Sequence, residues 1–337
     1  MPFTLSHAAA VLPAVRADGS GRARLVPAVL VAGSFAPDMT YYAASAVPGG
    51  MEFGAVTHSL PGVFTVDVLI AWLLVGLWLL VREPLVALLP RARQGRPAAL
   101  TRCGAPRARV RPSLLLRWYA CAVLGALTHV FWDAFTHHDR WGVRLFPVLD
   151  TQVAGSPLYW YLQYGGSALA AVVIAAFVTR ALRRSPAGGP VGVPALSARE
   201  RWGALALIGG CALVAAVRRA AGWWDHWGPR AEPWELVPTV CFGAGAGLMV
   251  GVVLYAGVVR VRGRVPARLR VRRPAGRSGG AGGATGAAGA GAGALGRADG
   301  ASASQGSGGS GGYEGSGGSG ISGGSGVSGE RSRPGVR

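Results

Sequence analysis

Two histidines and an aspartate recur at a fixed interval in the segment 126–139. His129, Asp133 and His137 are each four residues apart. Because an α-helix repeats every 3.6 residues, their side chains leave such a helix within one narrow arc. The preceding residues are mostly apolar, and unpaired imidazole and carboxylate groups are costly in such surroundings. A divalent metal is the partner that these side chains suit best, so the spacing predicts part of a metal site.

Further metal-type ligands lie upstream in the chain, one at the end of a predicted short helix and one just before the first long apolar segment. One is the aspartate of an Ala-Pro-Asp sequence, and another is the histidine of a Thr-His-Ser sequence. Together with His129 and Asp133 they give two nitrogen and two oxygen donors, a set suited to Zn²⁺ or a similar divalent cation. His7 and His137 remain as acid/base groups or as ligands of a second metal. The four candidate metal ligands are Asp38, His58, His129 and Asp133.

The composition indicates a membrane protein. Half of the 337 residues are hydrophobic, and the formal net charge of +19 comes from arginine alone because the chain has no lysine. Much of this charge lies in short clusters beside apolar runs, which predicts contact with anionic lipids at the cytoplasmic face and no nucleic-acid binding. The four cysteines are scattered, without the spacing of a disulfide or zinc framework.

Five apolar segments reach or approach the length of about 20 residues that crosses a bilayer. We therefore predict an all-α fold, an integral membrane helical bundle with about five transmembrane helices plus short N-terminal helices. A disordered C-terminal tail is expected to follow. The predicted spans are residues 62–81, 114–134, 158–179, 202–221 and 236–259.

The arginine distribution predicts how the spans are oriented. The connection between the first two spans carries eight arginines against one glutamate, so the positive-inside rule places it in the cytoplasm. Alternation then places the other arginine-rich connections on the same side. The connections 139–156 and 222–235, which are richer in acidic residues, are then on the extracytoplasmic side of the membrane. We expect a multi-pass protein of the cell membrane, with the candidate site on the extracytoplasmic side.

The two ends of the chain are predicted to differ from the membrane-spanning part. Residues 1–16 and 25–38 are predicted to form two short helices, and nearby arginines would keep them inside, away from His129. We favour a re-entrant pair that dips into the bundle; the alternative is that His7 is not a site residue. Residues 1–260 are expected to form the membrane-embedded helical domain with the metal site. Residues 261–337 would form a basic, then Gly/Ser-rich, disordered cytoplasmic tail, with 260–273 against the inner leaflet.

Four motifs carry a resemblance to known families: Met-Pro-Phe-Thr-Leu-Ser-His at the start, Gly-Ser-Phe-Ala-Pro-Asp, Thr-His-Ser-Leu-Pro-Gly, and the helix from Thr128 to His137. Over roughly residues 1–260 they resemble an uncharacterised bacterial membrane family, a domain of unknown function. They also resemble membrane-bound metal-dependent hydrolases and, more distantly, the zinc-dependent phospholipase C and single-strand nuclease superfamily, whose all-helical fold holds a cluster of zinc ions.

The resemblance implies a role for each residue. Asp38, His58, His129 and Asp133 would hold the best-determined metal, His137 a second metal, and His7 a third or bridging position. The chain departs from the superfamily because the later His-x-x-x-Glu ligand pair is absent. A site with one or two metals is therefore expected. The outer connection, with His226, Glu232 and Glu235, could supply a missing ligand.

Three functions are compatible with these residues. The first is a membrane-bound metal-dependent hydrolase that cleaves an ester or phosphodiester, on a lipid or lipid-linked substrate, with a metal-activated water. The second is a non-catalytic integral membrane protein in which the cluster is a structural metal site or a hydrogen-bonded site. The third, which fits less well, is a transporter that relays protons through Asp67 and the histidines. In the hydrolase, Asp67 could instead orient a ligand histidine.

Overall fold

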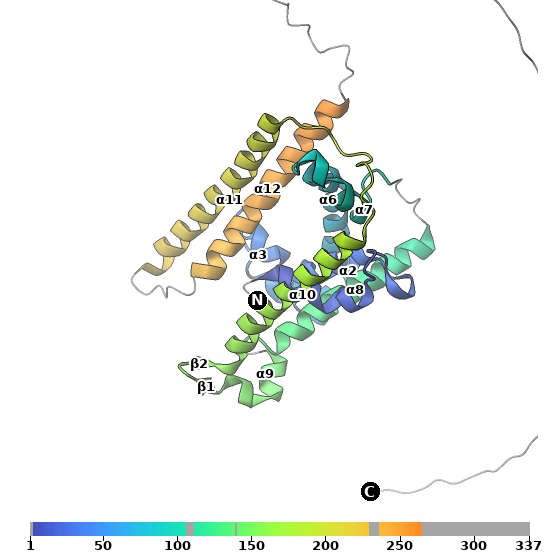
Figure 1. Ribbon diagram of the computed structural model, residues 1–337. Helices are drawn as coiled ribbons and strands as arrows, with labels where there is room; N and C mark the ends of the chain where they lie inside the picture. The colour runs from blue at the N-terminus through green and yellow to red at the C-terminus, as the bar shows by residue number, and fades with distance from the viewer. Residues whose placement is uncertain (1–2, 106–110, 139, 229–235, 265–337) are drawn as a thin grey trace, which may run out of the picture. The chain divides into compact units, whose positions relative to one another are not determined.

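The computed structural model describes residues 3–105, 111–138, 140–228 and 236–264, all within one compact unit (Figure 1). Its elements are helices apart from one hairpin of two short antiparallel strands, β1 (Gln152–Val153) and β2 (Ser156–Pro157). The predicted all-α class is confirmed. The predicted tail lies almost wholly outside the described residues.

Five helices are long and apolar enough to cross a membrane, as predicted. They extend beyond the predicted spans at several ends, because helical hydrogen bonding continues into the flanking arginine and tryptophan residues. The first span begins later than predicted: Thr65 is non-helical (φ −127°, ψ −80°) and separates a short preceding helix from the span. The five helices are α6 (Val66–Ala87), α8 (Pro112–Ala134), α10 (Leu158–Arg184), α11 (Ala198–Trp227) and α12 (Leu236–Arg264).

The N-terminal region forms more and shorter pieces than the two predicted helices. Prolines account for part of this, because a proline provides no backbone N–H to continue a helix. The pieces are η1 (Thr4–His7), α1 (Ala8–Val11), η2 (Leu12–Ala14), η3 (Arg22–Arg24), α2 (Pro27–Phe35), η4 (Ala36–Asp38), α3 (Met39–Ala43), α4 (Gly54–Thr57) and α5 (Leu60–Phe64). The connections between the spans add η5 (Arg91–Arg93), α7 (Gly95–Leu100), α9 (Trp141–Leu145) and η6 (Pro147–Asp150).

Helix α2 packs against both α8 and α6, so the N-terminal region lies inside the bundle. Two glycines permit a close crossing of α2 and α8. A Cβ atom on Gly33 would lie 2.4 Å from the carbonyl oxygen of Ala122, and one on Gly125 would lie 2.3 Å from that of Leu30. Small residues allow helix backbones to approach in this way. The buried position of α2 fits the predicted insertion of the N-terminal segments into the bundle.

Helices α11 and α12 pack side by side along their length (Figure 1). Helix α12 also packs against the second half of α6. Buried small and branched apolar side chains fill the space among α6, α11 and α12, and small side chains let helices pack closely in a membrane. They are Val81, Ala204, Ile208, Val252 and Ala256.

A polar contact joins α6 to α12 where α6 contains a proline. Pro84 has no backbone N–H, so the carbonyl oxygen of Leu80 loses its helical partner. The Arg260 Nε donates to that oxygen at 2.7 Å, and its Nη2 lies 2.7 Å from Glu83 Oε2. The sequence predicts a lipid-facing position for Arg260, but this side chain instead compensates for the proline and pairs with a buried acid.

We expect Arg260→Leu to lower the free energy of unfolding by about 1–3 kcal/mol, because it leaves the Leu80 carbonyl and the Glu83 carboxylate without this donor. Thermal unfolding in detergent would measure the change. Arg262→Leu is the matched control. Arg262 lies two residues further on α12, and its contact with Glu200 is long (3.5 Å) and exposed. Equal effects of the two substitutions would contradict the assigned role of Arg260.

Candidate metal centre

Four buried side chains from three parts of the chain converge on one point. Asp38 ends η4, His58 directly follows α4, and His129 and Asp133 lie one turn apart on α8. One donor atom from each residue can be chosen such that all four lie within 4.8 Å of one another. Among the described residues this is the one group of three or more His, Cys, Asp or Glu side chains that meets this criterion. The geometry could hold a metal ion.

The nitrogen-to-oxygen distances in this cluster are nearly uniform. The Nε2 atom of His129 lies 3.4 Å from Asp38 Oδ1 and 3.3 Å from Asp133 Oδ2. The Nε2 atom of His58 lies 3.6 Å and 3.5 Å from the same two oxygens. Charge-assisted N–H···O hydrogen bonds are shorter, about 2.7–2.9 Å. In a tetrahedral zinc site with bonds of about 2.0–2.2 Å, the ligand atoms are about 3.3–3.6 Å apart.

Both histidines are held so that Nε2 faces the two carboxylates. The Nδ1 of His129 lies 2.8 Å from the carbonyl oxygen of Ser34, and the Nδ1 of His58 lies 2.9 Å from that of Gly54. An Nδ1–H that donates to a carbonyl places the lone pair of the neutral ring on Nε2. The Nε2 of His129 is buried without a hydrogen-bond partner. A metal ion would supply the missing partner.

The carbonyl group that orients His129 is available because α2 ends beside it. The last four carbonyl groups of a helix have no intrahelical partner, and Ser34 is the penultimate residue of α2. The close crossing at Gly33 and Gly125 brings α2 next to the turn of α8 that carries His129. The position of His129 therefore depends on a backbone contact between two helices.

The carboxylate of Asp38 is held by a residue of the N-terminal segment. The hydroxyl of Thr4 donates to Asp38 Oδ2 at 2.6 Å, while Oδ1 faces the histidines. Burial acts to raise the pKa of Asp38, but His129 and His58 outweigh it and hold this pKa well below its usual range. For His58, burial acts to lower the pKa, but its contacts with Asp133 and Asp38 raise it. Sequence reasoning missed Thr4, although it lies in the same motif as His7.

His7 lies directly against the cluster, as the inserted N-terminal segment predicts. Its ring stacks on that of His129, with centroids 3.5 Å apart and an interplanar angle of 11°. Its Nε2 lies 3.5 Å from Asp133 Oδ1, the carboxylate oxygen that is not part of the four-atom set. Burial lowers the pKa of His7 well below its usual range, which favours the neutral form of the ring. The His7 ring covers one face of the His129 ring.

His137 lies one turn beyond Asp133 and is more exposed than the four candidate ligands. Its Nδ1 is 3.7 Å from Asp133 Oδ1, and its Nε2 is 3.1 Å from the Nε2 of Gln163 on α10. Partial burial lowers the pKa of His137 to about 4. His137 is therefore close to the cluster without joining its four-atom set. Gln163 was not predicted, because nothing in the local sequence of α10 marks it.

Two further described candidates, Asp67 and His226, are not among the four converging residues. Asp67 lies in the first turn of α6, fully buried, and both its oxygens lack a hydrogen-bond partner. His226 is exposed in the last turn of α11 and is not among the converging residues. Glu232 and Glu235, proposed with it as additional ligands, lie outside the described residues. His138 is exposed, as its place after His137 suggests.

A pocket of about 510 Å³ opens beside the cluster. His58, Asp133 and His137 form part of its wall, and α3, α10 and α12 supply mainly aromatic side chains. Among these aromatic residues are Tyr41, Tyr159 and Trp160. The pocket gives a path from outside the bundle to the His58 and Asp133 side of the cluster.

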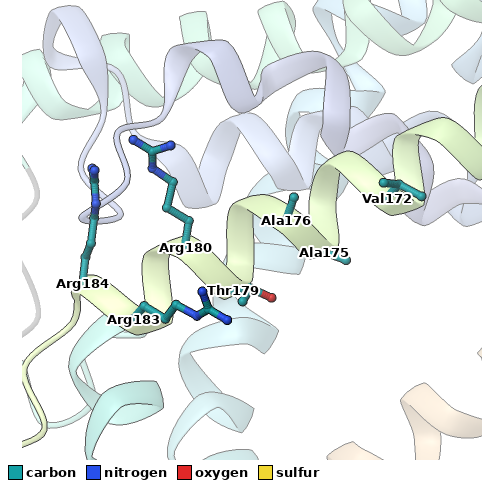
Figure 2. Close-up of a pocket in the computed structure, with 7 residues that line it drawn as sticks. All are labelled: Val172, Ala175, Ala176, Thr179, Arg180, Arg183 and Arg184. Atoms are coloured by element: carbon teal, nitrogen blue, oxygen red, sulfur yellow. The ribbon is translucent and has the colours of Figure 1, made fainter.

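A larger pocket of about 780 Å³ lies at the other end of α10 (Figure 2). Its wall holds no His, Cys, Asp or Glu among the described residues, so it offers no metal-type ligand. Its charged members are Arg180, Arg183 and Arg184, which Figure 2 shows extending from the last turns of the helix. This pocket fits anionic groups and is separate from the His/Asp cluster.

These features define a multi-pass helical protein with a buried His/Asp cluster beneath an aromatic pocket. Comparison with protein families matches residues 1–257 to the family described as a domain of unknown function, DUF4184, and the chain belongs to that family. The predicted membership of an uncharacterised family is thus confirmed. Neither the curated proteins nor the solved structures gave a match. The hydrolase resemblance is not confirmed by these comparisons and stays a prediction.

Proposed function

We propose that Asp38, His58, His129 and Asp133 bind one divalent metal ion, with Zn²⁺ preferred. The observation that carries this proposal is the spacing of the four donor atoms: 3.3–3.6 Å is too long for charge-assisted hydrogen bonds and suits a tetrahedral shell. Two carboxylates also balance the charge of a divalent cation. Two neutral imidazoles complete a donor set that zinc commonly takes.

We infer further that the site hydrolyses an ester or phosphodiester. A bound divalent ion lowers the pKa of coordinated water to near neutrality, which supplies a nucleophile at neutral pH. The pocket reaches the cluster beside His58 and Asp133, so a substrate would approach from there. His137 lines the same pocket and is placed to accept or donate a proton, whereas His7 lies against His129 and holds that ring in place. A lipid or lipid-linked substrate fits a site among membrane spans.

The number of ligands also supports a second function. Four protein ligands fill a tetrahedral shell, as they do in structural zinc sites, whereas catalytic zinc sites keep a position for water or substrate. In a structural site the ion would tie the N-terminal segments to α8. The pocket beside His58 and Asp133 favours catalysis, because it gives a fifth ligand access to the cluster. The two functions differ in whether the bound ion accepts a ligand from the pocket.

Metal content and thermal stability together test the metal site. Protein purified without chelators should contain about one divalent ion per chain. Removing that ion should lower the melting temperature, and Zn²⁺ should restore it, because a ligand at 100 times its Kd stabilises the native state by about 2.7 kcal/mol. Mg²⁺ is the control ion, since it prefers oxygen ligands and octahedral geometry. A chain that neither holds an ion nor responds to Zn²⁺ would rule out the metal site.

The sidedness is a separate proposal that rests on the arginine distribution. We place the cluster and its pocket on the extracytoplasmic side of the cell membrane, and the arginines of the larger pocket at the cytoplasmic face, where anionic lipids would contact them (Figure 2). The exposed His138, next to the cluster, provides the test. A cysteine at position 138 should react with an impermeant maleimide from outside intact cells. Reaction only after the cells are opened would contradict this orientation.

A further inference from the structure

The pocket beside the cluster has one charged side chain that the metal site does not use. Arg140 lines it and is half-buried. Among the described lining residues it is the one arginine, and the chain has no lysine. The Arg140 guanidinium lies near the Tyr41 hydroxyl, where it opposes the burial that raises the pKa of Tyr41. A planar guanidinium beside a hydroxyl is suited to binding a phosphate.

The electrostatic balance of the pocket favours an anionic ligand. A divalent ion held by two carboxylates and two neutral imidazoles has no net charge, so Arg140 would leave this region positive. The described lining residues include one acid, Asp133, which is one of the proposed metal ligands. An anion between the ion and Arg140 would complete the charge balance.

Much of the aromatic wall of the pocket comes from the first two turns of two membrane spans. Tyr159, Trp160 and Tyr164 lie on α10, and Phe242 lies on α12. These two helices have different main packing partners: α10 packs on η1, α1 and α7, whereas α12 packs on α11 and α6. The space of about 510 Å³ holds a head group and only part of an acyl chain. The rest of such a chain would leave between the two spans.

We propose that this pocket binds a membrane lipid with a phosphate head group, whose phosphate lies between the metal centre and Arg140 and whose chain lies against the aromatic residues of α10 and α12. The inference rests on the proposed metal site and names the substrate class that the site would take. Arg140 selects the anionic head group, and the aromatic wall selects the chain.

Cobalt provides a direct readout, because the visible absorption of Co²⁺ reports its coordination. The full chain, loaded with Co²⁺ in a nonionic detergent, would be titrated with dihexanoyl phosphatidylglycerol, dihexanoyl phosphatidylcholine and inorganic phosphate. We expect the anionic lipid to change the spectrum at concentrations at least about tenfold lower than either of the others. Arg140→Gln should lower the affinity for the anionic lipid about tenfold or more, and a tenfold change corresponds to about 1.4 kcal/mol. Arg144→Gln should leave binding of the anionic lipid unchanged, because Arg144 lies on α9, the short helix that Arg140 caps, and outside the pocket lining.

The outcomes separate the inference from the proposed function. Failure to bind Co²⁺ would contradict the metal site itself. Bound Co²⁺ with a spectrum that no ligand changes would show that the pocket does not open on the ion, which overturns the lipid proposal alone. Equal potency of phosphatidylcholine would refute head-group selection, and equal potency of inorganic phosphate would refute the chain contact. If Arg140→Gln does not fold, Arg140→Lys, which keeps the charge but not the planar fork, should still weaken lipid binding.

Discussion

Replacing Asp133 by alanine is expected to remove the bound metal from the purified protein. One oxygen of Asp133, Oδ2, faces both candidate histidine ligands, at 3.3 Å from His129 and 3.5 Å from His58. Removing a ligand-orienting group alone typically costs 10–100-fold in metal affinity, so loss of a ligand should cost at least about a hundredfold. Metal content per chain, measured by mass spectrometry after dialysis against metal-free buffer, would show the loss.

Two further variants separate metal loss from unfolding. Asp133→Asn keeps the size of the side chain and removes its charge, so it should also lose metal while packing is retained. Asp150→Ala is the matched control, since Asp150 is an exposed acid in η6. The metal-free forms of Asp133→Asn and the wild type should then melt at similar temperatures. Metal retained at wild-type affinity in Asp133→Ala would exclude Asp133 as a ligand.

The spans could be predicted from the sequence because bilayer thickness sets a length for apolar segments. The residues at which the spans begin and end could be predicted less accurately. Thr65 interrupts the first span through its backbone conformation, and arginines extend the last turns of α10 and α12. The N-terminal region was harder still to predict, because its short pieces pack against several helices that are distant in the sequence, among them α6, α8 and α10. Such packing depends on contacts between distant segments.

The four candidate ligands could be found from residue type and position, since few ionisable residues lie in or beside the apolar segments. The residues that position them left weaker signals. Ser34 contributes a backbone carbonyl, which any residue could supply. Gly33 and Gly125 permit the crossing of α2 and α8, but they are two of 54 glycines in the chain. Gln163 and Arg140 line the same pocket from different elements, and no local sequence pattern indicates that these elements meet.

The two oxygens of Asp133 face different partners, and this divides the cluster into two parts. Oδ2 faces His58 and His129, whereas Oδ1 lies 3.5 Å from His7 and 3.7 Å from His137. Of these two outer histidines, His137 lines the pocket and His7 does not. In the proposed hydrolase the metal-holding and proton-transferring groups would therefore meet at Asp133, with His137 on the substrate side.

His137→Gln is accordingly expected to lower hydrolysis by at least about a hundredfold while the metal remains bound. General acid–base groups typically contribute 10²–10⁴-fold to a rate, and glutamine keeps much of the size of histidine without its titratable ring. Hydrolysis of the chromogenic phosphodiester bis(4-nitrophenyl) phosphate, followed together with metal content, would measure both properties in one preparation. His226→Gln is the control, because His226 is exposed and lies outside the pocket lining.

Each pattern of results points to a different role for His137. Loss of activity with metal retained supports acid–base catalysis. Loss of the metal as well would make His137 a ligand, although its Nδ1 lies outside the set of four converging atoms. A wild-type protein that holds its ion but cleaves neither this substrate nor phosphatidylglycerol would favour the structural site, because four protein ligands already complete a tetrahedral shell. The activities of the wild type and of His137→Gln, read together with their metal contents, thus distinguish the two proposed functions.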